Sequence, residues 1–250
     1  MNKSLSTTGL LLFISLVVTA QTDTITTASK KLLSNSIASG RKSYAVFFTD
    51  SVDNRLTTAD IWDRDVKLVT NASGIKQYDF RWHWYRNDSL LMEADAICDF
   101  PTLKPLSYKI LRPKRKPTEI TFEQNEVQIK TVSRRTKRDT AFTVNHGIPA
   151  FAFPMDMEIF SLLPIKKSGQ KFIIPFYEPG SPTANWYPVT VTGYEDLQLT
   201  GHLMVKCWII RIDYTGSAAS ATFWITEKDR DLLKMKSCFK GKCRYKVKLY

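Results

Sequence analysis

The stretch Val205-Lys-Cys-Trp-Ile-Ile-Arg-Ile-Asp-Tyr214 decides the fold, because large apolar side chains recur in it at every second position. This period is typical of a β-strand with one buried face. The predicted buried face carries Trp208, Ile210, Ile212 and Tyr214.

The residues that follow continue the pattern. A Gly-Ser turn at 216–217 leads to Ala221-Thr-Phe-Trp-Ile-Thr226, and the charged turn Glu227-Lys-Asp-Arg230 leads to Asp231-Leu-Leu-Lys-Met-Lys236. Turns this short join neighbouring antiparallel strands. The last third of the chain therefore predicts an antiparallel sheet.

The rest of the chain predicts more strands and one helix. Further strands are expected over 43–48, 59–69, 78–85, 90–98, 106–111, 119–123, 126–132, 172–177, 189–192 and 240–248. A helix is expected over 154–163, because Pro154 suits a first turn and Pro164 stops the helix. The predicted fold is mainly β, a curled antiparallel sheet or open β-barrel with one short helix packed on or inside it.

The N-terminus predicts export. Lys3 precedes an apolar run from Gly9 to Val18, and small or β-branched residues at 18–20 resemble a signal-peptidase site. The run is shorter than the ~20 residues of a membrane-spanning helix. We therefore expect a signal peptide at 1–20, a loosely structured leader or an edge strand with a short helix at 21–41, and a single β-rich domain at 42–250. The protein is expected to be periplasmic or secreted and not membrane-spanning.

The chain is basic, with a net charge of +12 that falls by one if residues 1–20 are removed. A positive surface favours anionic partners, such as lipid headgroups or other anionic envelope components. Nucleic acid is not expected, because export and the absence of a nucleic-acid-binding motif argue against it. Two basic turns, at 112–117 and 134–138, are interpreted as solvated loop tips, with an anion-binding patch as the alternative.

Four cysteines in an oxidising compartment favour pairing. Cys238 and Cys243 bracket a tight turn and are predicted to form a disulfide within a basic hairpin at 237–250. Cys98 and Cys207 lie on core-like strands, and the sequence leaves open whether they pair.

The alternation of the last strand is at odds with the register of the predicted disulfide hairpin. From Lys240 to Lys248 every even position is Lys or Arg, which predicts one wet basic face. A hairpin closed by Cys238 and Cys243 would place Lys236 beside Tyr245 and mix the two faces. A bulge, or another neighbour for the tail, is expected to resolve this.

Catalytic signatures are absent from the sequence. There is no nucleophile elbow, phosphate-binding loop or His-Glu-x-x-His motif, and the histidines at 83, 146 and 202 lack metal-ligand spacing. We therefore assign no catalytic residue, no metal and no cofactor. Glu93, Asp95 and Asp99 share one strand face, which keeps open a glycan hydrolase as a lesser alternative.

Aromatic side chains are the best candidates for binding. They gather around 80–84 and 172–187, where they would line the mouth of an incompletely closed sheet. The candidate ligand-binding residues are Trp82, Trp84, Met155, Phe176, Tyr177, Trp186 and Tyr187. The alternative is that these side chains fill the core.

Four stretches carry a family resemblance. They are Ala94–Tyr108, the helix Met155–Leu163 with Pro164, Tyr187–Glu195 and Gly201–Lys236. In them the chain resembles an exported bacterial family, domain of unknown function 3108. The resemblance implies an exported antiparallel β protein of the Bacteroidetes kind and transfers no catalytic residue. The hairpin after 236 falls outside the pattern, and the outline is similar to that of periplasmic lipoprotein carriers, an analogy of fold alone.

These observations favour a non-enzymatic envelope protein that binds an apolar or amphipathic ligand, such as a lipid, or a partner. The alternative is a structural or interaction module without a ligand.

Overall fold

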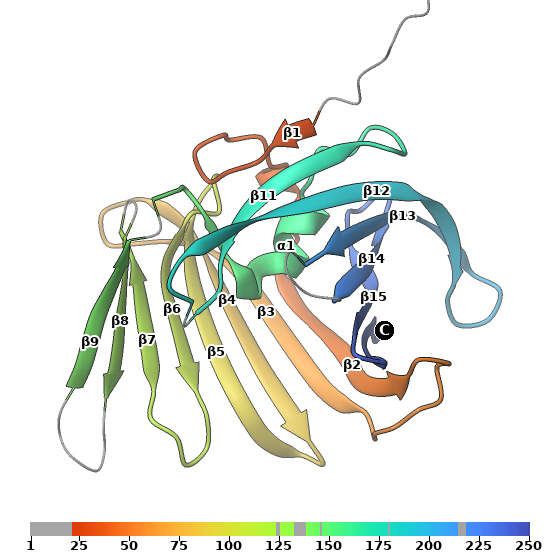
Figure 1. The fold of residues 1–250 in the computed structure, drawn as a ribbon, viewed down its shortest axis with the longest axis horizontal. Coiled ribbons are helices and arrows are strands. Elements are labelled where there is room, and N and C mark those ends of the chain that lie inside the picture. Colours follow the sequence, from red (N-terminus) through yellow and green to blue (C-terminus); the bar gives the residue numbers. More distant parts are fainter. Residues whose placement is uncertain (1–21, 124–125, 133–138, 146, 180, 215–218) are drawn as a thin grey trace, which may run out of the picture.

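One large antiparallel sheet dominates the computed structural model, which describes residues 22–123, 126–132, 139–145, 147–179, 181–214 and 219–250. Within these residues the sheet has sixteen strands and curls without closing (Figure 1). This architecture confirms the predicted fold class.

The strands form two arms. The N-terminal arm contains β2 (Gly40–Asp50), β3 (Asp60–Thr70), β4 (Lys76–Arg86), β5 (Ser89–Asp99), β6 (Pro105–Leu111), β7 (Thr118–Phe122), β8 (Glu126–Val132) and β9 (Asp139–Asn145). The C-terminal arm contains β11 (Lys171–Tyr177), β12 (Ala184–Gln198), β13 (Met204–Asp213), β14 (Ser220–Thr226) and β15 (Leu232–Phe239). Within each arm, strands that follow one another in sequence pair antiparallel.

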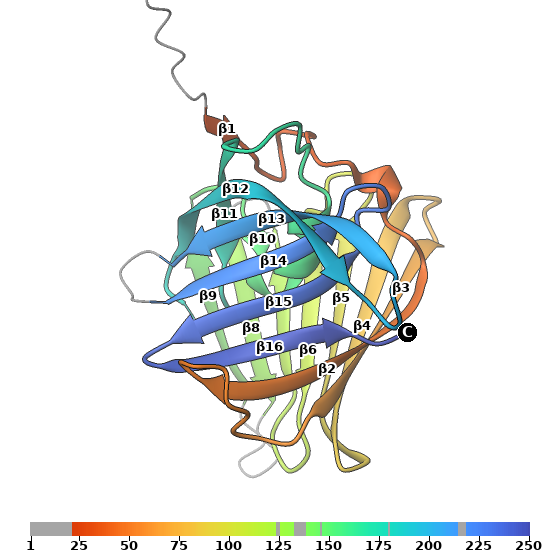
Figure 2. The ribbon, with the colours of Figure 1, turned by 90° about the vertical axis from the view of Figure 1, so that its right-hand side faces the viewer.

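The last strand, β16 (Lys242–Lys248), joins the arms because it pairs with β15 on one side and with β2 on the other. The arms then fold over each other, and their strands cross at a steep angle (Figure 2). Cys238 and Cys243 face each other across the β15–β16 pair and form the predicted disulfide.

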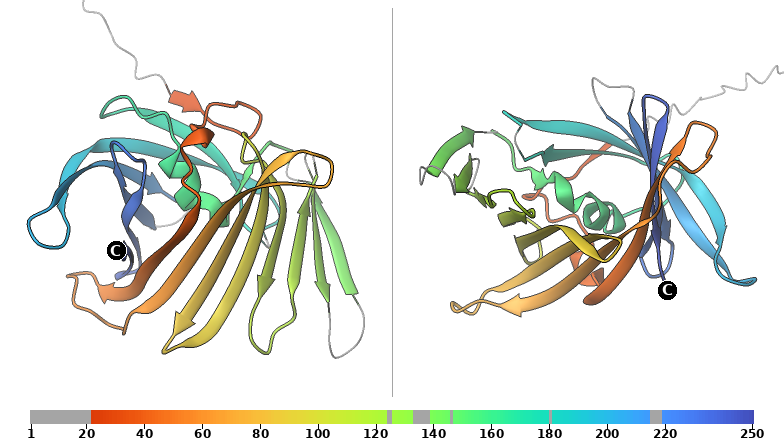
Figure 3. Two further views of the ribbon diagram at one scale, coloured as in Figure 1. Left: turned by 180° about the vertical axis from the view of Figure 1, so that it is seen from behind. Right: turned by 90° about the horizontal axis from the view of Figure 1, so that it is seen from below.

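A short helix lies between the arms (Figure 3). A 3-10 turn, η2 (Phe153–Met155), leads into α1 (Asp156–Ser161), so the helix is shorter than the predicted span 154–163. Pro154 sits in the 3-10 turn, and the helix ends at Ser161 with Leu162 as its C-cap, because Leu163, which precedes Pro164, disfavours helical geometry. Ile159 and Phe160 are completely buried in the core.

The segment before β2 packs onto the sheet as a short edge strand followed by a 3-10 turn. β1 (Thr22–Thr24) pairs parallel with β11, and η1 (Ser34–Ser36) follows it. Ile25 is fully buried, and the backbone carbonyl of Ser34 accepts a hydrogen bond from the Tyr78 hydroxyl.

The core lies on the concave faces of both arms and around α1. Trp208, Ile210 and Ile212 of β13 are buried as predicted, and Phe223 of β14 packs edge-on against Phe160 at 4.7 Å between ring centroids. A short strand, β10 (Phe151–Ala152), pairs parallel with β11 beside the helix. Across the described residues, no helix is long and apolar enough to span a membrane.

Candidate ligand-binding cavity

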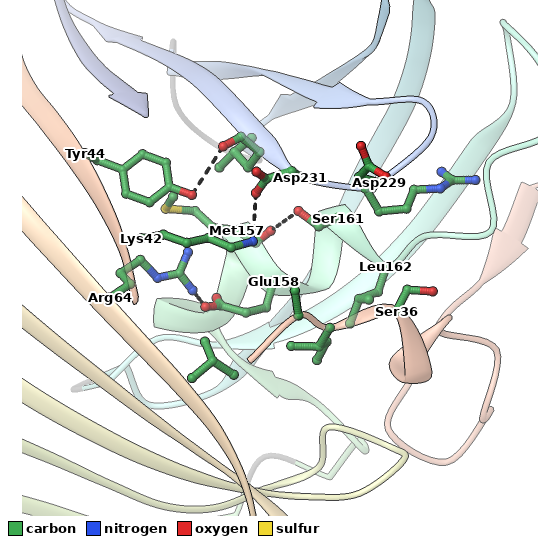
Figure 4. Close-up of a pocket in the computed structure, with 15 residues that line it drawn as sticks. Ser36, Lys42, Tyr44, Arg64, Met157, Glu158, Ser161, Leu162, Asp229 and Asp231 are labelled. Atoms are coloured by element: carbon green, nitrogen blue, oxygen red, sulfur yellow. Dashed lines mark hydrogen bonds and ion pairs between the residues drawn. The ribbon is translucent and has the colours of Figure 1, made fainter. Parts of the chain in front are cut away.

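The concave side of the sheet holds two hollows of different character. The smaller one is a polar cleft of about 50 Å³ at the junction of β2, β3, α1 and the β14–β15 turn (Figure 4). Since one water takes up about 30 Å³ of liquid, this cleft has room for little more than water.

Charged groups of the cleft pair with one another. Arg64 of β3 forms a buried ion pair with Glu158 of α1. The Lys42 ammonium lies 2.7 Å from the Asp231 carboxylate, which also pairs with Lys248. Burial disfavours the charge of Asp231, but the hydrogen bonds from the two lysines outweigh it and lower the pKa of this carboxyl. These pairs tie the two arms and the helix together, so we interpret the cleft as structural.

The larger hollow is a cavity of about 420 Å³ between the concave face of β3–β6, the η2–α1 segment and β16. Its wall is mostly aromatic and aliphatic along β3–β6, and charged groups come from β16, from the start of α1 and from the residues that directly follow β6 and β11. It is lined by Trp62, Trp82, Trp84, Met92, Ala94, Tyr108, Ile110, Arg112, Phe153, Pro154, Asp156, Glu178, Pro179, Arg244 and Lys246.

Cross-strand register builds the aromatic wall. Trp62 of β3 lies directly opposite Trp84 of β4, and the two indoles stack with their centroids 5.9 Å apart. Trp82, two residues along β4, meets Tyr108 of β6 edge-on at 6.2 Å. The Trp84 indole N–H donates to Asp60 at 2.9 Å. Ring pairs of this kind form a stiff apolar surface.

The basic side chains of β16 point inward, which corrects the prediction of a wet basic face. Lys246 lies opposite Met235 of β15 and Val46 of β2, both of which are buried. Cys243 and Tyr245 therefore occupy the outer face. The sequence alternates as predicted, but its basic face lies on the inner side of the sheet, where Arg244 and Lys246 line the cavity.

No bulge interrupts the β15–β16 pair, so Lys236 does lie beside Tyr245. On the outer face, Asp53 stabilises the neighbouring charged and aromatic side chains. It accepts hydrogen bonds from the Lys236 ammonium at 2.9 Å and from the Tyr245 hydroxyl at 2.8 Å. The Lys236 ammonium also lies 5.2 Å from the Tyr245 ring centroid. The predicted conflict is thus resolved by side-chain contacts.

Lys246 is the most unusual residue of the cavity wall, because it is only 3% exposed. Its ammonium lies 3.9 Å from the centroid of the Trp62 ring and 3.4 Å from the sulfur of Met157. Burial lowers the pKa of Lys246 well below its usual value, the Asp156 carboxylate opposes this shift, and the cations Arg244 and Arg64 reinforce it.

The cavity also contains two carboxylates. Asp156 begins α1 and is buried, and its Oδ1 accepts a hydrogen bond from the Met157 backbone N–H at 2.7 Å. Glu178 follows β11 and is exposed. Neither lies within 4 Å of a basic group in the described part of the chain, so the wall presents charges of both signs.

The seven predicted ligand-binding residues fall into three places. Trp82 and Trp84 line the cavity. Met155, Phe176, Tyr177 and Tyr187 lie in the closed core instead, because the C-terminal arm folds over α1 and covers them. Trp186 alternates with Tyr187 along β12 and is 38% exposed on the opposite face. The structure thus places two of the seven residues together in the cavity wall. Four others are part of the core, as the alternative interpretation predicted.

Several cavity residues were missed by sequence reasoning. Trp62 was missed because its pairing with Trp84 depends on register between two strands. Arg244 and Lys246 were missed because basic side chains were assigned to solvent. The spacing Arg244-x-Lys246-x-Lys248 placed them on one face, but only the fold shows which side of the sheet that face covers.

The alternative carboxylates lie elsewhere. Glu93, Asp95 and Asp99 alternate with the buried residues Ala94 and Ala96 of β5, and therefore lie on the convex face. There Asp95 lies 3.8 Å from Arg81, and Glu93 lies 3.8 Å from His83. These carboxylates line neither of the two concave hollows.

The remaining cysteines and candidate metal ligands form no centre. Cys98 and Cys207 are buried free thiols, and burial raises the pKa of Cys207 to about 11. No group of three or more His, Cys, Asp or Glu that could hold a metal ion occurs among the described residues. His146 and the turns at 134–138 and 216–217 lie outside those residues.

The fold and the cavity define a class of protein, a curled and open antiparallel sheet that encloses one helix and an aromatic-walled cavity. The family model "Protein of unknown function (DUF3108)" matches residues 43–248, and the chain belongs to this family. The match extends through the terminal hairpin, which corrects the expectation that the pattern ends at 236.

Two solved structures are similar in outline. One is a beta-barrel-like protein of domain of unknown function DUF1849 from Brucella abortus, with 9% identity, a TM-score of 0.48, and coverage of 85% of this chain and 98% of that one. The other is a Bacteroides fragilis protein with a YmcC-like fold, with 6% identity, a TM-score of 0.34, and coverage of 84% and 94%. No curated protein matches the chain.

Proposed function

We propose that this protein binds an apolar or amphipathic ligand in the cavity between β3–β6 and α1, and that it acts by binding and not by catalysis. One observation carries the proposal. The cavity of about 420 Å³ is walled by three tryptophans and is left unfilled by the protein's own side chains. Ligand pockets commonly measure about 300–1,000 Å³ and are mostly apolar with a few polar groups.

We further propose that the protein acts in the cell envelope after export. The apolar stretch at 9–18 supports a signal peptide. The Cys238–Cys243 disulfide supports an oxidising compartment, because such bonds are rare in reducing cytosol. Anionic envelope components are the partners that the net charge of +12 favours.

A neutral fluorescent probe tests cavity binding. N-phenylnaphthylamine brightens in apolar sites, and we expect saturable binding to the purified protein. Trp84→Ala removes a wall residue and should weaken probe binding by about tenfold, since truncating a well-packed aromatic contact costs about 1–2 kcal/mol or more.

Trp186→Ala is the matched control, because it removes the same side chain from the face of β12 that lies outside the cavity. It should leave probe binding unchanged. Circular dichroism must show that both variants are folded. Equal loss of binding in the two variants, or no saturable binding in the wild type, would count against a ligand and favour the structural module.

A further inference from the structure

We propose that the ligand is an anionic amphiphile, with its acidic head group bound by Lys246 and Arg244 at the β16 end of the cavity and its apolar chain along the tryptophan wall. This inference rests on the proposed function, because it assigns a ligand class to the same cavity.

The first step is the missing partner of Lys246. In the described part of the chain no carboxylate lies within 4 Å of its ammonium, which contacts the Trp62 ring and the Met157 thioether. A buried charge is unfavourable unless an opposite charge or several hydrogen bonds compensate it. Aromatic and sulfur contacts offset only part of that cost. An acidic oxygen delivered by a ligand would complete the site.

The second step is the contrast along β16. Lys248, on the same inner face as Lys246, is paired with Asp231, and that carboxylate also binds Lys42. Arg244 and Lys246 have no such partner among the described residues, and both line the cavity. Two neighbouring like charges repel each other, so an anion between them would relieve the repulsion as well as the desolvation.

The third step is the chemistry of the opposite wall. Trp62, Trp82 and Trp84 share the concave face of β3 and β4, with Met92 next to them on β5. Trp62 belongs to both walls, because one neighbour of its ring is the Trp84 indole and another is the Lys246 ammonium. A ligand with an acidic head and an apolar chain would satisfy the two walls together.

The main alternative is a cationic or zwitterionic ligand, because the cavity also contains two carboxylates. Asp156 accepts a backbone N–H, and acidic groups are favoured in the first turn of a helix, so its charge is already partly stabilised. Glu178 is exposed to water. The Lys246 ammonium has neither a backbone hydrogen-bond partner among the described residues nor exposure to water. We therefore infer that the ligand's head group is an anion.

Isothermal titration with decyl amphiphiles tests the inference. Decanoate and decyl phosphate should each bind the wild-type protein about tenfold or more tightly than decanol, since hydrogen bonds between charged groups are stronger than those to a neutral hydroxyl. Decyltrimethylammonium should bind no more tightly than decanol. The ranking of decanoate against decyl phosphate distinguishes a fatty-acid head from a phospholipid-like head.

Lys246→Met assigns the effect to the inner face of β16. It should abolish the preference for the acidic head group, so that decanoate and decanol bind this variant about equally tightly. Lys242→Met is the matched control, because it removes the same charge from the same face of the same strand at an exposed position outside the cavity. It should change neither affinity.

The outcomes separate the two claims. Equal binding of decanoate and decanol, or a preference for decyltrimethylammonium, would overturn the anionic ligand while cavity binding stands. Absence of binding by every decyl probe would overturn the proposed function itself. If Lys246→Met does not fold, the wild-type ranking still decides between head groups, and Arg244→Met provides the second substitution on the cavity wall.

Discussion

Lys246, which we propose binds the acidic head group, occupies a site that is unfavourable for a charged side chain. Its ammonium is shielded from water, and the surrounding ring and thioether stabilise the charge less than water does. Its pKa is therefore well below that of an exposed lysine. Between the lowered folded-state pKa and 10.5, the unfolded chain holds more protons than the folded protein does.

We expect Lys246→Met to raise the free energy of unfolding of the ligand-free protein by about 1–2 kcal/mol at neutral pH, because an apolar side chain of similar shape replaces an unpaired buried charge. The sign of the pH dependence follows. The Lys246 contribution to wild-type stability becomes more favourable as the pH rises towards about 10.5, where the unfolded lysine also becomes neutral. The advantage of the variant should therefore shrink as the pH rises.

Urea unfolding of both proteins at several pH values measures this difference, and other titrating groups largely cancel in the comparison. A wild-type protein that is more stable than Lys246→Met at neutral pH, without ligand, would show that Lys246 is satisfied internally. The groups that face its ammonium are Asp156 of α1, Arg64 of β3 and Arg244 of β16.

Arg64 differs from Lys246, because its buried charge is compensated by that of Glu158. Arg64→Met should lower the free energy of unfolding by about 3–5 kcal/mol, because it leaves the Glu158 carboxylate buried and unpaired. The double variant Arg64→Met with Glu158→Leu should recover much of this loss. A double-mutant cycle in urea measures the recovery, and additive losses would contradict a direct coupling.

At the scale of elements, β16 holds the sheet together. It is the only connection in the strand order between the arm that ends at β15 and the arm that begins at β2 within the described residues. Its pairing with β2 joins positions far apart in the chain, for example Lys248 with Tyr44 and Lys242 with Asp50. β16 thus completes the hydrogen bonding of β2, a strand near the other end of the described sequence.

Deleting residues 242–250 should therefore prevent stable folding. The deletion leaves unpaired edges on β15 and β2, and exposed edges of this kind promote aggregation. Deleting Tyr250 alone is the control, because this residue is 73% exposed and follows the strand. The soluble yield and the thermal transition of each protein measure the effect. A monomeric, cooperatively folded product of the larger deletion would contradict a joining role for β16.

The strands were predictable because alternation is a local property. The aromatic face of β4, the hairpin to β5 and the apolar face of β13 were all predicted from neighbouring residues. The side of the sheet that each face covers is not local. In β16 the basic face was assigned to water, yet Lys246 is buried against Trp62 because the two arms fold over each other. The part of the cavity wall that β16 contributes could therefore not be predicted from the sequence.

At the scale of the whole molecule, both arms contribute to one core. Phe80 of the N-terminal arm, Phe160 of α1 and Phe223 of the C-terminal arm belong to the same buried cluster. Neither arm covers its own concave face, and the helix has no other surface to pack on. The cavity lies where this packing is incomplete, between β3–β6 and the start of α1. The proposed binding site is thus a consequence of how the arms meet.

This shared core predicts that the domain at 42–250 unfolds as one unit. Loss of either arm would expose the concave face of the other, so partial unfolding would forfeit most of the hydrophobic stabilisation, about 25 cal/mol for each Å² of apolar surface. Differential scanning calorimetry should give a single transition with equal calorimetric and van't Hoff enthalpies. A saturating anionic amphiphile should move that whole transition upward, because a ligand that binds only the folded state stabilises it by mass action. Two separate transitions, with only one of them shifted by decanoate, would instead show that the arms fold independently and that the cavity belongs to one of them.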